Sequence, residues 1–310
     1  MAQIGLMIEG QDGLTWERWD RILRTADEFG YQCVFRSDHF TNPNPPDIES
    51  LEAWVSLTYA ATATERIEFG TLVSPITFRH PSILVRMAAA IDDLSQGRLV
   101  LGMGAGWQER EHRLFGVPFY DFPKRFNMLR DGLEVVTRLL HSDDPVSFKS
   151  DYFPLERATL LPRPKRPGGP PLLIGGIGKK RTLPLAAEFA DEWNGVLVSA
   201  EKYRELNAHL NDLLMERGRK PGEVKRSLMT RVLIAKDDAA LNDLLRSKGK
   251  TLDEVRSSGR ALVGTPSMVI DQIGAFVDAG VERFMLQWLE LDDIDRIEMM
   301  AREVLPHFHR

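Results

Sequence analysis

The chain alternates short apolar runs with longer helical stretches eight times, and this alternation constrains the fold more than any other feature. The first run, residues 4–8, is followed by residues 15–29, where apolar side chains recur at helical spacing until Gly30. Repeated strand–helix units predict a parallel sheet covered by helices. We expect the other strands at 33–36, 66–75, 98–103, 172–176, 191–198, 228–235 and 282–288. We expect the other helices at 50–64, 81–94, 123–140, 179–190, 201–217, 264–280 and 292–304.

The number of units distinguishes a barrel from an open sheet. Eight units close a (β/α)8 TIM barrel, whereas an open doubly wound sheet usually has about five or six strands. A dinucleotide-binding open sheet also carries a glycine fingerprint after its first strand, and EGQDGL at 9–14 is not that fingerprint. We therefore expect residues 1–310 to form one α/β barrel domain.

Two segments interrupt the alternation. Residues 141–170 contain six prolines and fit neither the strand nor the helix period. We expect this insertion to pass over the barrel mouth, either as a lid or substrate wall or as a plain surface insertion. Residues 237–258 are polar with a helical pattern, which predicts a helical insertion after the seventh strand.

Composition argues against several classes of function. The net charge is −5 without a long block of either sign, so we expect a small polar molecule as partner, not nucleic acid or a membrane. Cys33 is the only cysteine, and no HxH or HExxH pattern groups the histidines, so we expect no disulfide and no metal site. The first ten residues lack a basic lead and no apolar run reaches about 18 residues, which predicts a cytoplasmic protein.

Residues suited to chemistry follow the predicted strands, and in a barrel the loops after the strands meet at one face. Asp38 and His39 follow the second strand, where a histidine can exchange a proton near neutral pH; the alternative is that both side chains only satisfy local backbone. Arg79 follows the third strand and either holds an anion or forms a structural ion pair. Residues 104–106, Gly-Ala-Gly, either let a ligand approach the main chain or form an empty tight turn.

The fifth strand leads into glycines followed by cations. Gly175, Gly176 and Gly178 precede the basic residues 179–181 at the start of a predicted helix. Main-chain N–H groups at the positive end of a helix, next to three cations, favour a phosphate ligand. The pattern is not the GxxxxGK[ST] loop of nucleotide hydrolases, and the alternative is a simple turn.

Five segments together resemble the luciferase-like monooxygenase superfamily, on the branch that uses the deazaflavin coenzyme F420. The segments are SDHF at 37–40, FGTLVSPITFRHP at 69–81, LSQGRLVLGMGAGWQEREH at 94–112, PLLIGGIGKKRTLPLAAEFADEWN at 171–194 and VGTP at 263–266. The resemblance covers nearly the whole chain. It implies a luciferase-like barrel with an insertion after the helix of strand 4, in a protein that is often a homodimer.

The resemblance also implies how the coenzyme is held. His39 and Asp38 are the expected catalytic residues beside the ring, and His39 is the one expected to transfer a proton to or from the substrate. A bulge at the end of strand 3, with a cis peptide between non-proline residues, is expected to support the ring from behind. The implied coenzyme contacts are Asp38, Leu72, Val73, Ser74, Gly104, Ala105, Gly106, Trp107, Gly175, Gly176, Ile177, Gly178 and Lys179.

One departure from the branch affects the substrate. Sugar-phosphate dehydrogenases of the branch have a carboxylate proton donor where this chain has Trp107, which argues against a glucose-6-phosphate activity. Glu109 or Glu111 is the alternative donor, but we expect both to face solvent or a helix N-terminus, and His112 to lie on a helix surface.

Three functions follow from these observations. The first is a coenzyme F420-dependent oxidoreductase that transfers a hydride between the deazaflavin and a small organic substrate. The second is an FMN-dependent monooxygenase that uses oxygen, and the third is a barrel that binds a cofactor without chemistry. The Asp38 and His39 pair argues against the third, whereas the first two need the same phosphate site and are poorly separated by sequence. We favour the first because of the resemblance to the F420-dependent branch.

Overall fold

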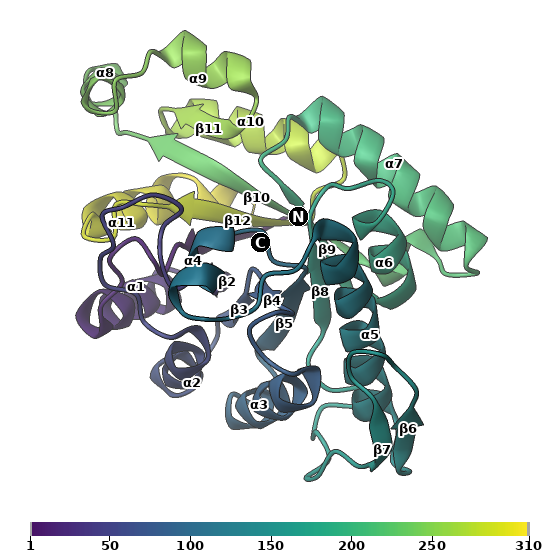
Figure 1. Ribbon diagram of the computed structural model, residues 1–310. Helices are drawn as coiled ribbons and strands as arrows, with labels where there is room; N and C mark the ends of the chain where they lie inside the picture. Colours follow the sequence, from purple (N-terminus) through teal and green to yellow (C-terminus); the bar gives the residue numbers. More distant parts are fainter. Residues whose placement is uncertain (1, 309–310) are drawn as a thin grey trace.

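The computed structural model describes residues 2–308 and shows a closed barrel of parallel strands surrounded by helices (Figure 1). The barrel closes because β12 pairs in parallel with both β1 and β10. The predicted (β/α)8 fold is therefore confirmed. The barrel strands are β1 (Gln3–Ile8), β2 (Cys33–Arg36), β3 (Glu68–Thr71) continued by β4 (Ser74–Pro75), β5 (Leu99–Gly104), β8 (Leu172–Gly175), β9 (Glu192–Val196), β10 (Lys225–Ile234) and β12 (Arg283–Trp288).

The helices begin where the sequence offers capping residues. The Thr15 side chain accepts a hydrogen bond from the Arg18 amide at the start of α1, and Thr265 stands at the N-cap before Pro266 of α10, as predicted. None of the helices within residues 2–308 is long and apolar enough to cross a bilayer. The helices are α1 (Trp16–Glu28), α2 (Ala53–Ala63), α3 (Pro81–Leu94), α4 (Glu109–Leu114), α5 (Phe122–His141), α6 (Thr182–Phe189), α7 (Ala200–Glu216), α8 (Asp238–Ser247), α9 (Leu252–Ser258), α10 (Pro266–Asp278) and α11 (Ile294–Glu303), with 3-10 turns at Pro221–Glu223 and Leu305–His307.

The sheet separates two parts of the core. A large apolar cluster fills the space between the barrel and the helices, and a smaller cluster fills the barrel interior. The interior cluster consists of Met7, Cys33, Phe35, Val100, Leu173, Met229 and Met285. Nearer the N-terminal ends of the strands, the buried Arg283 pairs with Glu192 at 3.0 Å and also with Glu68. Burial lowers the pKa of Arg283, but these carboxylates outweigh it, so the guanidinium stays charged.

A one-residue bulge separates β3 from β4. Gly70 pairs with Val100 of β5 and Ser74 pairs with Met103, so four steps along one strand face three along the other. The peptide between Leu72 and Val73 inside this bulge is cis, as the family resemblance implied. The bulge lies at the C-terminal end of the strand, where barrels place their reactive groups.

The Pro-rich insertion does not pass over the barrel mouth, so that expectation was wrong. It leaves α5 at the end opposite to the mouth and forms a short hairpin of β6 (Val146–Phe148) and β7 (Leu155–Ala158). Its contacts are with α3 and α5: Ser150 bonds to Asp131, Arg163 donates to the last carbonyls of α5, and Arg166 pairs with Asp92 at 3.1 Å. Figure 1 shows the hairpin on the outer wall beside α5.

The second insertion covers part of the mouth instead. Strand β10 continues beyond the barrel, where it pairs with β11 (Ala261–Gly264), a strand that the sequence pattern did not predict. Helices α8 and α9 pack on this extension through a separate apolar cluster that includes Leu233 and Val255. An ion pair between Lys248 and Glu290 ties the insertion to the loop after β12.

Candidate active site

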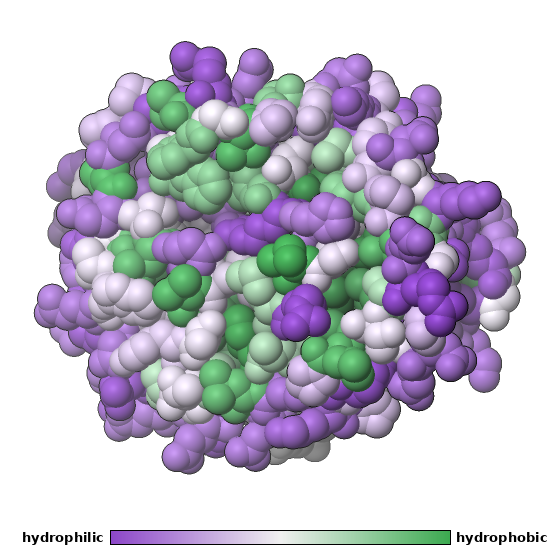
Figure 2. All heavy atoms as spheres, turned by 60° about the horizontal axis from the view of Figure 1, so that its bottom comes forward, coloured by the Kyte–Doolittle hydropathy of each residue, from purple (hydrophilic) through white to green (hydrophobic). Residues whose placement is uncertain are grey.

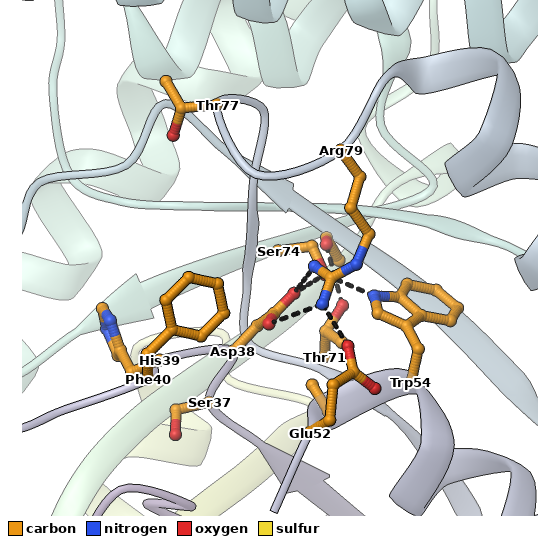
Figure 3. Close-up of polar contacts among 12 residues, drawn as sticks. Ser37, Asp38, His39, Phe40, Glu52, Trp54, Thr71, Ser74, Thr77 and Arg79 are labelled. Atoms are coloured by element: carbon orange, nitrogen blue, oxygen red, sulfur yellow. Dashed lines mark hydrogen bonds and ion pairs between the residues drawn. The ribbon is translucent and has the colours of Figure 1, made fainter. Parts of the chain in front are cut away.

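Asp38 is buried in an ion pair at the end of β2. Both of its carboxylate oxygens accept from Arg79, at 2.5 and 3.2 Å, and the Ser74 hydroxyl donates to the same carboxylate at 2.6 Å. Trp54 in turn donates to Ser74 at 3.0 Å, and Arg79 also pairs with Glu52 (Figure 3). Burial lowers the pKa of Arg79, and the neighbouring carboxylates raise it by more. The structural ion pair expected as one alternative for Arg79 is confirmed.

His39 points away from this ion pair (Figure 3). Glu111 holds its ring. The His39 Nδ1 lies 2.7 Å from one oxygen of Glu111, and the Phe40 amide donates to the other at 2.8 Å. An ionised carboxylate only accepts, so Nδ1 carries the proton and Nε2 of a neutral ring is left as an acceptor. Burial lowers the pKa of His39, but the hydrogen bond to Glu111 and the negative charges of Glu111, Glu9 and Asp38 together outweigh it, so the net shift is upward.

Two neighbouring residues of α4 contradict the expectation of surface positions. The Glu111 side chain is fully buried, and His112 is equally buried. His112 bonds through one ring nitrogen to the Gln108 carbonyl and through the other to the Thr77 hydroxyl, both at 2.7 Å. Burial lowers the pKa of His112, which keeps the ring neutral. Glu109, by contrast, is exposed as expected.

The segment after β5 borders the histidine. Trp107 is 63% exposed, and its ring stands edge-on to the His39 ring at 5.4 Å. Gly106 has a positive φ of 76°, and a Cβ there would lie 3.2 Å from the Thr77 hydroxyl oxygen. Ala105 packs against the core. Trp107 is thus the residue of this segment that presents a large side chain to the mouth.

The bulge residues Leu72 and Val73 form an apolar platform over the interior core. A Cβ on Gly102, Gly104 or Gly175 would lie 3.1, 2.5 or 3.3 Å from the methyl groups of Val73. These glycines therefore make room for the valine, which differs from the expectation that Gly104 leaves the main chain open to a ligand. A platform of this kind fits one face of a flat ring.

The loop between β8 and α6 exposes main-chain N–H groups. Gly176 has a φ of +128°, which favours glycine, and Trp193 fixes its carbonyl with a hydrogen bond of 2.8 Å. Within residues 2–308, the amides of residues 177–180 donate to no acceptor. They lie just before Thr182, the first residue of α6, at the positive end of that helix. This loop fits a phosphate group, as the sequence predicted.

The cations of this loop are partly engaged with other groups. Lys179 pairs with Glu205 of α7, which also binds Lys202 at 2.6 Å. These two hydrogen bonds lower the pKa of Glu205 to about 2. Arg181 lies over the ring of Phe122. Contact between Lys179 and a phosphate stays a prediction.

The structure brings the predicted residues to one face and adds one that the sequence did not single out. The loops carrying His39, the bulge, Trp107 and the residues 175–178 all follow barrel strands. Glu111 was missed as a partner of His39; its position two residues after Glu109 on a charged helix gave no sign of burial. No group of three or more His, Cys, Asp or Glu side chains among residues 2–308 is arranged to hold a metal ion.

Comparison with known proteins identifies the family to which this chain belongs. The family described as luciferase-like monooxygenase matches residues 3–255. An F420-dependent glucose-6-phosphate dehydrogenase of Intrasporangium calvum is 25% identical over 99% of this chain and 98% of its own length. The 4-hydroxyprotoasukamycin monooxygenase of Streptomyces nodosus subsp. asukaensis is 32% identical over 58% of this chain.

Coverage and structure qualify these matches. The chain spans about half the length of the first two curated relatives, 47% and 53%. A solved F420-dependent secondary alcohol dehydrogenase in complex with an F420–acetone adduct superposes with a TM-score of 0.86 at 22% identity, covering 100% of this chain and 99% of that one. That likeness concerns the fold. Because the family match covers most of the barrel, the chain belongs to the luciferase-like monooxygenase family.

Proposed function

We propose that the protein is a coenzyme F420-dependent oxidoreductase acting on a small organic substrate. The observation that carries the proposal is the pair of partly buried His39 and buried Glu111, with the Leu72–Val73 platform at the end of the neighbouring strand and unpaired amides of residues 177–180 on the same face of the barrel. The relative that matches nearly the full chain is named as F420-dependent, which supports the deazaflavin. Trp107 in place of a carboxylate argues for a substrate other than glucose 6-phosphate.

The chain's own residues would handle the proton. When bound, the deazaflavin would accept or supply a hydride, that is, one proton together with two electrons. With an alcohol as substrate, Nε2 of His39 would accept the hydroxyl proton while the alcohol carbon gives up the hydride, and a carbonyl group would be left. In the reverse direction the protonated His39 returns the proton. Glu111 stabilises the charged imidazole in both directions.

The other residues of the site would bind and orient the coenzyme. The platform of Leu72 and Val73 supports the ring, and the amides of residues 177–180 hold a phosphate. Asp38 was predicted as catalytic, but its two oxygens are occupied by Arg79 and Ser74. We therefore assign Asp38 a positioning role: it fixes the end of β2 and hence the backbone of His39.

Titration of the purified protein with F420 and with FMN tests the proposal. We expect F420 to bind more tightly than FMN, with a change in deazaflavin fluorescence. Replacing Lys179 with Gln should weaken F420 binding, whereas Lys202→Gln, which removes the other partner of Glu205, serves as the matched control. Tight binding of neither cofactor would refute the proposal.

A His39→Ala variant separates catalysis from binding. If His39 transfers the proton, turnover should fall by about 10²–10⁴-fold while F420 affinity changes little. An equal loss of turnover and affinity would favour a binding barrel without chemistry.

The FMN monooxygenase is the second candidate. It is favoured by solved relatives of the same fold, such as a long-chain alkane monooxygenase with a TM-score of 0.82 at 14% identity. Oxygen consumption after addition of reduced FMN, above the spontaneous oxidation of free reduced FMN, would support it. We expect no such excess, because we expect the site to bind the deazaflavin in preference to FMN.

We also infer a homodimer formed through α2 and α3. These helices carry exposed apolar side chains, Val55 and Ile83, and Leu161 of the Pro-rich insertion lies next to Ile83 and is 59% exposed. Figure 2 brings this side forward and shows apolar residues among the charged ones. Light scattering should give twice the monomer mass, and the double variant Val55→Glu, Ile83→Glu should reduce it to the monomer value.

A further inference from the structure

Polar side chains form a layer across one half of the barrel mouth. Met229 and Met285 face the barrel interior, and side chains two residues further along a strand point to the same side. On these strands the next inward positions are Arg231 and Gln287, which pair in register. On β1 the same step leads from Met7 to Glu9, just past the strand end.

Hydrogen bonds join this layer into one network. Arg231 Nε donates to the amide oxygen of Gln287 at 3.2 Å, and the Gln287 amide nitrogen donates to Glu9 at 2.6 Å. Gln11 donates to the second oxygen of Glu9 at 3.0 Å and accepts from the Ser37 hydroxyl at 2.6 Å. The network therefore runs from Arg231 to the residue two places before His39.

Arg231 ends this network with unused donors. Its two terminal Nη nitrogens have no hydrogen-bond or ion-pair partner among residues 2–308. Arg231 is exposed. Glu9, the carboxylate of the network, already accepts hydrogen bonds from Gln287 and Gln11. A guanidinium with two open Nη groups matches the two oxygens of a carboxylate or phosphate.

The open end of Arg231 faces a basic cavity beneath the second insertion. The cavity measures about 460 Å³ and lies between β10, β11 and the α8–α9 segment. Lys250 and Arg260 line it together with Arg231, and neither has an ion pair among the described residues. Glu254, the carboxylate in the lining, accepts the Thr251 amide at 2.8 Å, and this hydrogen bond lowers its pKa. Three cations against one carboxylate leave the cavity positive in a chain whose net charge is −5.

We propose that this cavity binds an anionic oxygen group, a carboxylate or a phosphate, at one end of the substrate. The proposal rests on the proposed function, because it requires the other end of the substrate to lie near His39. Arg231 would bind the anion through its Nη atoms, while Gln287 and Glu9 hold the guanidinium from the opposite side. The ring platform at Leu72 and Val73 lies on the other half of the mouth and would not be involved.

Calorimetric titration of coenzyme-free protein tests the site directly. The probes are succinate and inorganic phosphate at low ionic strength, with neutral succinamide as control. Phosphate can also bind the amides of residues 177–180, so only binding that is lost in the cavity variants is assigned to the cavity. We expect at least one anion to bind and succinamide not to bind, and the better anion identifies the group. Arg231→Gln and Lys250→Gln should each lower the affinity for the anion by roughly tenfold or more.

The matched control is Arg246→Gln, which removes the same charge from α8 at a residue beside Asp243 outside the cavity. It should leave anion affinity unchanged. Lys250→Gln lies in an exposed turn and keeps the test valid if Arg231→Gln fails to fold. Absence of anion binding, or equal affinity in wild type and both variants, would overturn the proposal.

A coenzyme titration separates this site from the proposed function. Arg231→Gln should bind F420 as wild type does, because the platform and the phosphate loop are elsewhere. A parallel loss of F420 affinity would mean that the cavity holds an anionic part of the coenzyme, and would refute a substrate site. Failure of the wild type to bind F420 refutes the proposed function but leaves the anion result standing.

Discussion

Replacing Glu111 with Gln probes the pair that defines the site. Glu111 accepts from His39 and from the Phe40 amide, and Gln keeps the shape but has only one oxygen that accepts. One hydrogen bond to a charged group is therefore lost, which costs about 1.5–3 kcal/mol of unfolding free energy. The Glu109→Gln variant is the control, because Glu109 is exposed on the same helix and should change stability by less than about 0.5 kcal/mol.

The stability lost in Glu111→Gln should be larger at low pH than at high pH. Burial alone lowers the pKa of His39, and the hydrogen bond and charge of Glu111, together with the charges of Glu9 and Asp38, raise it above the ordinary 6.5. A raised histidine pKa contributes stability that is fully present below 6.5 and is lost as pH rises through the folded value. Urea unfolding at about pH 5.5 and about pH 8.5 should therefore show a larger deficit of Glu111→Gln at the lower pH. An equal deficit at both values would refute the assigned pairing.

Three further perturbations test other parts of the structure. Burial raises the pKa of Cys33 to about 12, so a thiol reagent should not label the folded protein at about pH 8 but should label it fully in urea; labelling of the folded protein would contradict the interior position. Gly104→Ala places a Cβ 2.5 Å from a methyl of the bulge valine and should cost about 1–3 kcal/mol in urea unfolding, whereas Gly222→Ala meets nothing within 4 Å and should be neutral; equal effects would be inconsistent with this packing. Arg283→Leu should cost about 3–5 kcal/mol, because Glu192 is left buried without its partner, and a loss below about 1 kcal/mol would speak against a charged pair.

Most of the fold was predicted from the pattern of apolar residues in the sequence. The long helices repeat apolar residues at helical spacing and the buried strands are short continuous apolar runs, so α5, for example, was expected at 123–140 and lies at Phe122–His141. The hairpin strands β6 and β7 contain polar or charged residues and form no continuous apolar run. Strand β11 is a run of four residues that lies directly before the start of α10, where a helix was expected. The path of the Pro-rich segment depends on where α5 ends relative to the barrel, which composition does not encode.

The site was only partly predictable for a related reason. His39 and the glycine loop could be found because strand ends are recognisable and barrels gather them at one face. Glu111 and His112 belong to the six-residue helix α4, whose charged sequence suggests solvent. Their burial comes from α4 folding back over the loop after β2, a contact between residues about 70 positions apart in the chain.

The division of the mouth into two halves bears on how such a protein can acquire new specificity. On one half the surface is made by main chain, a bulge and three glycines that accommodate Val73, so a change there rebuilds the backbone. On the other half it is made by the side chains of Glu9, Arg231 and Gln287 on regular strands. A single amino-acid substitution can change one of these side chains without moving a strand. Selection can therefore change which substrate binds while the site proposed for the coenzyme stays unchanged.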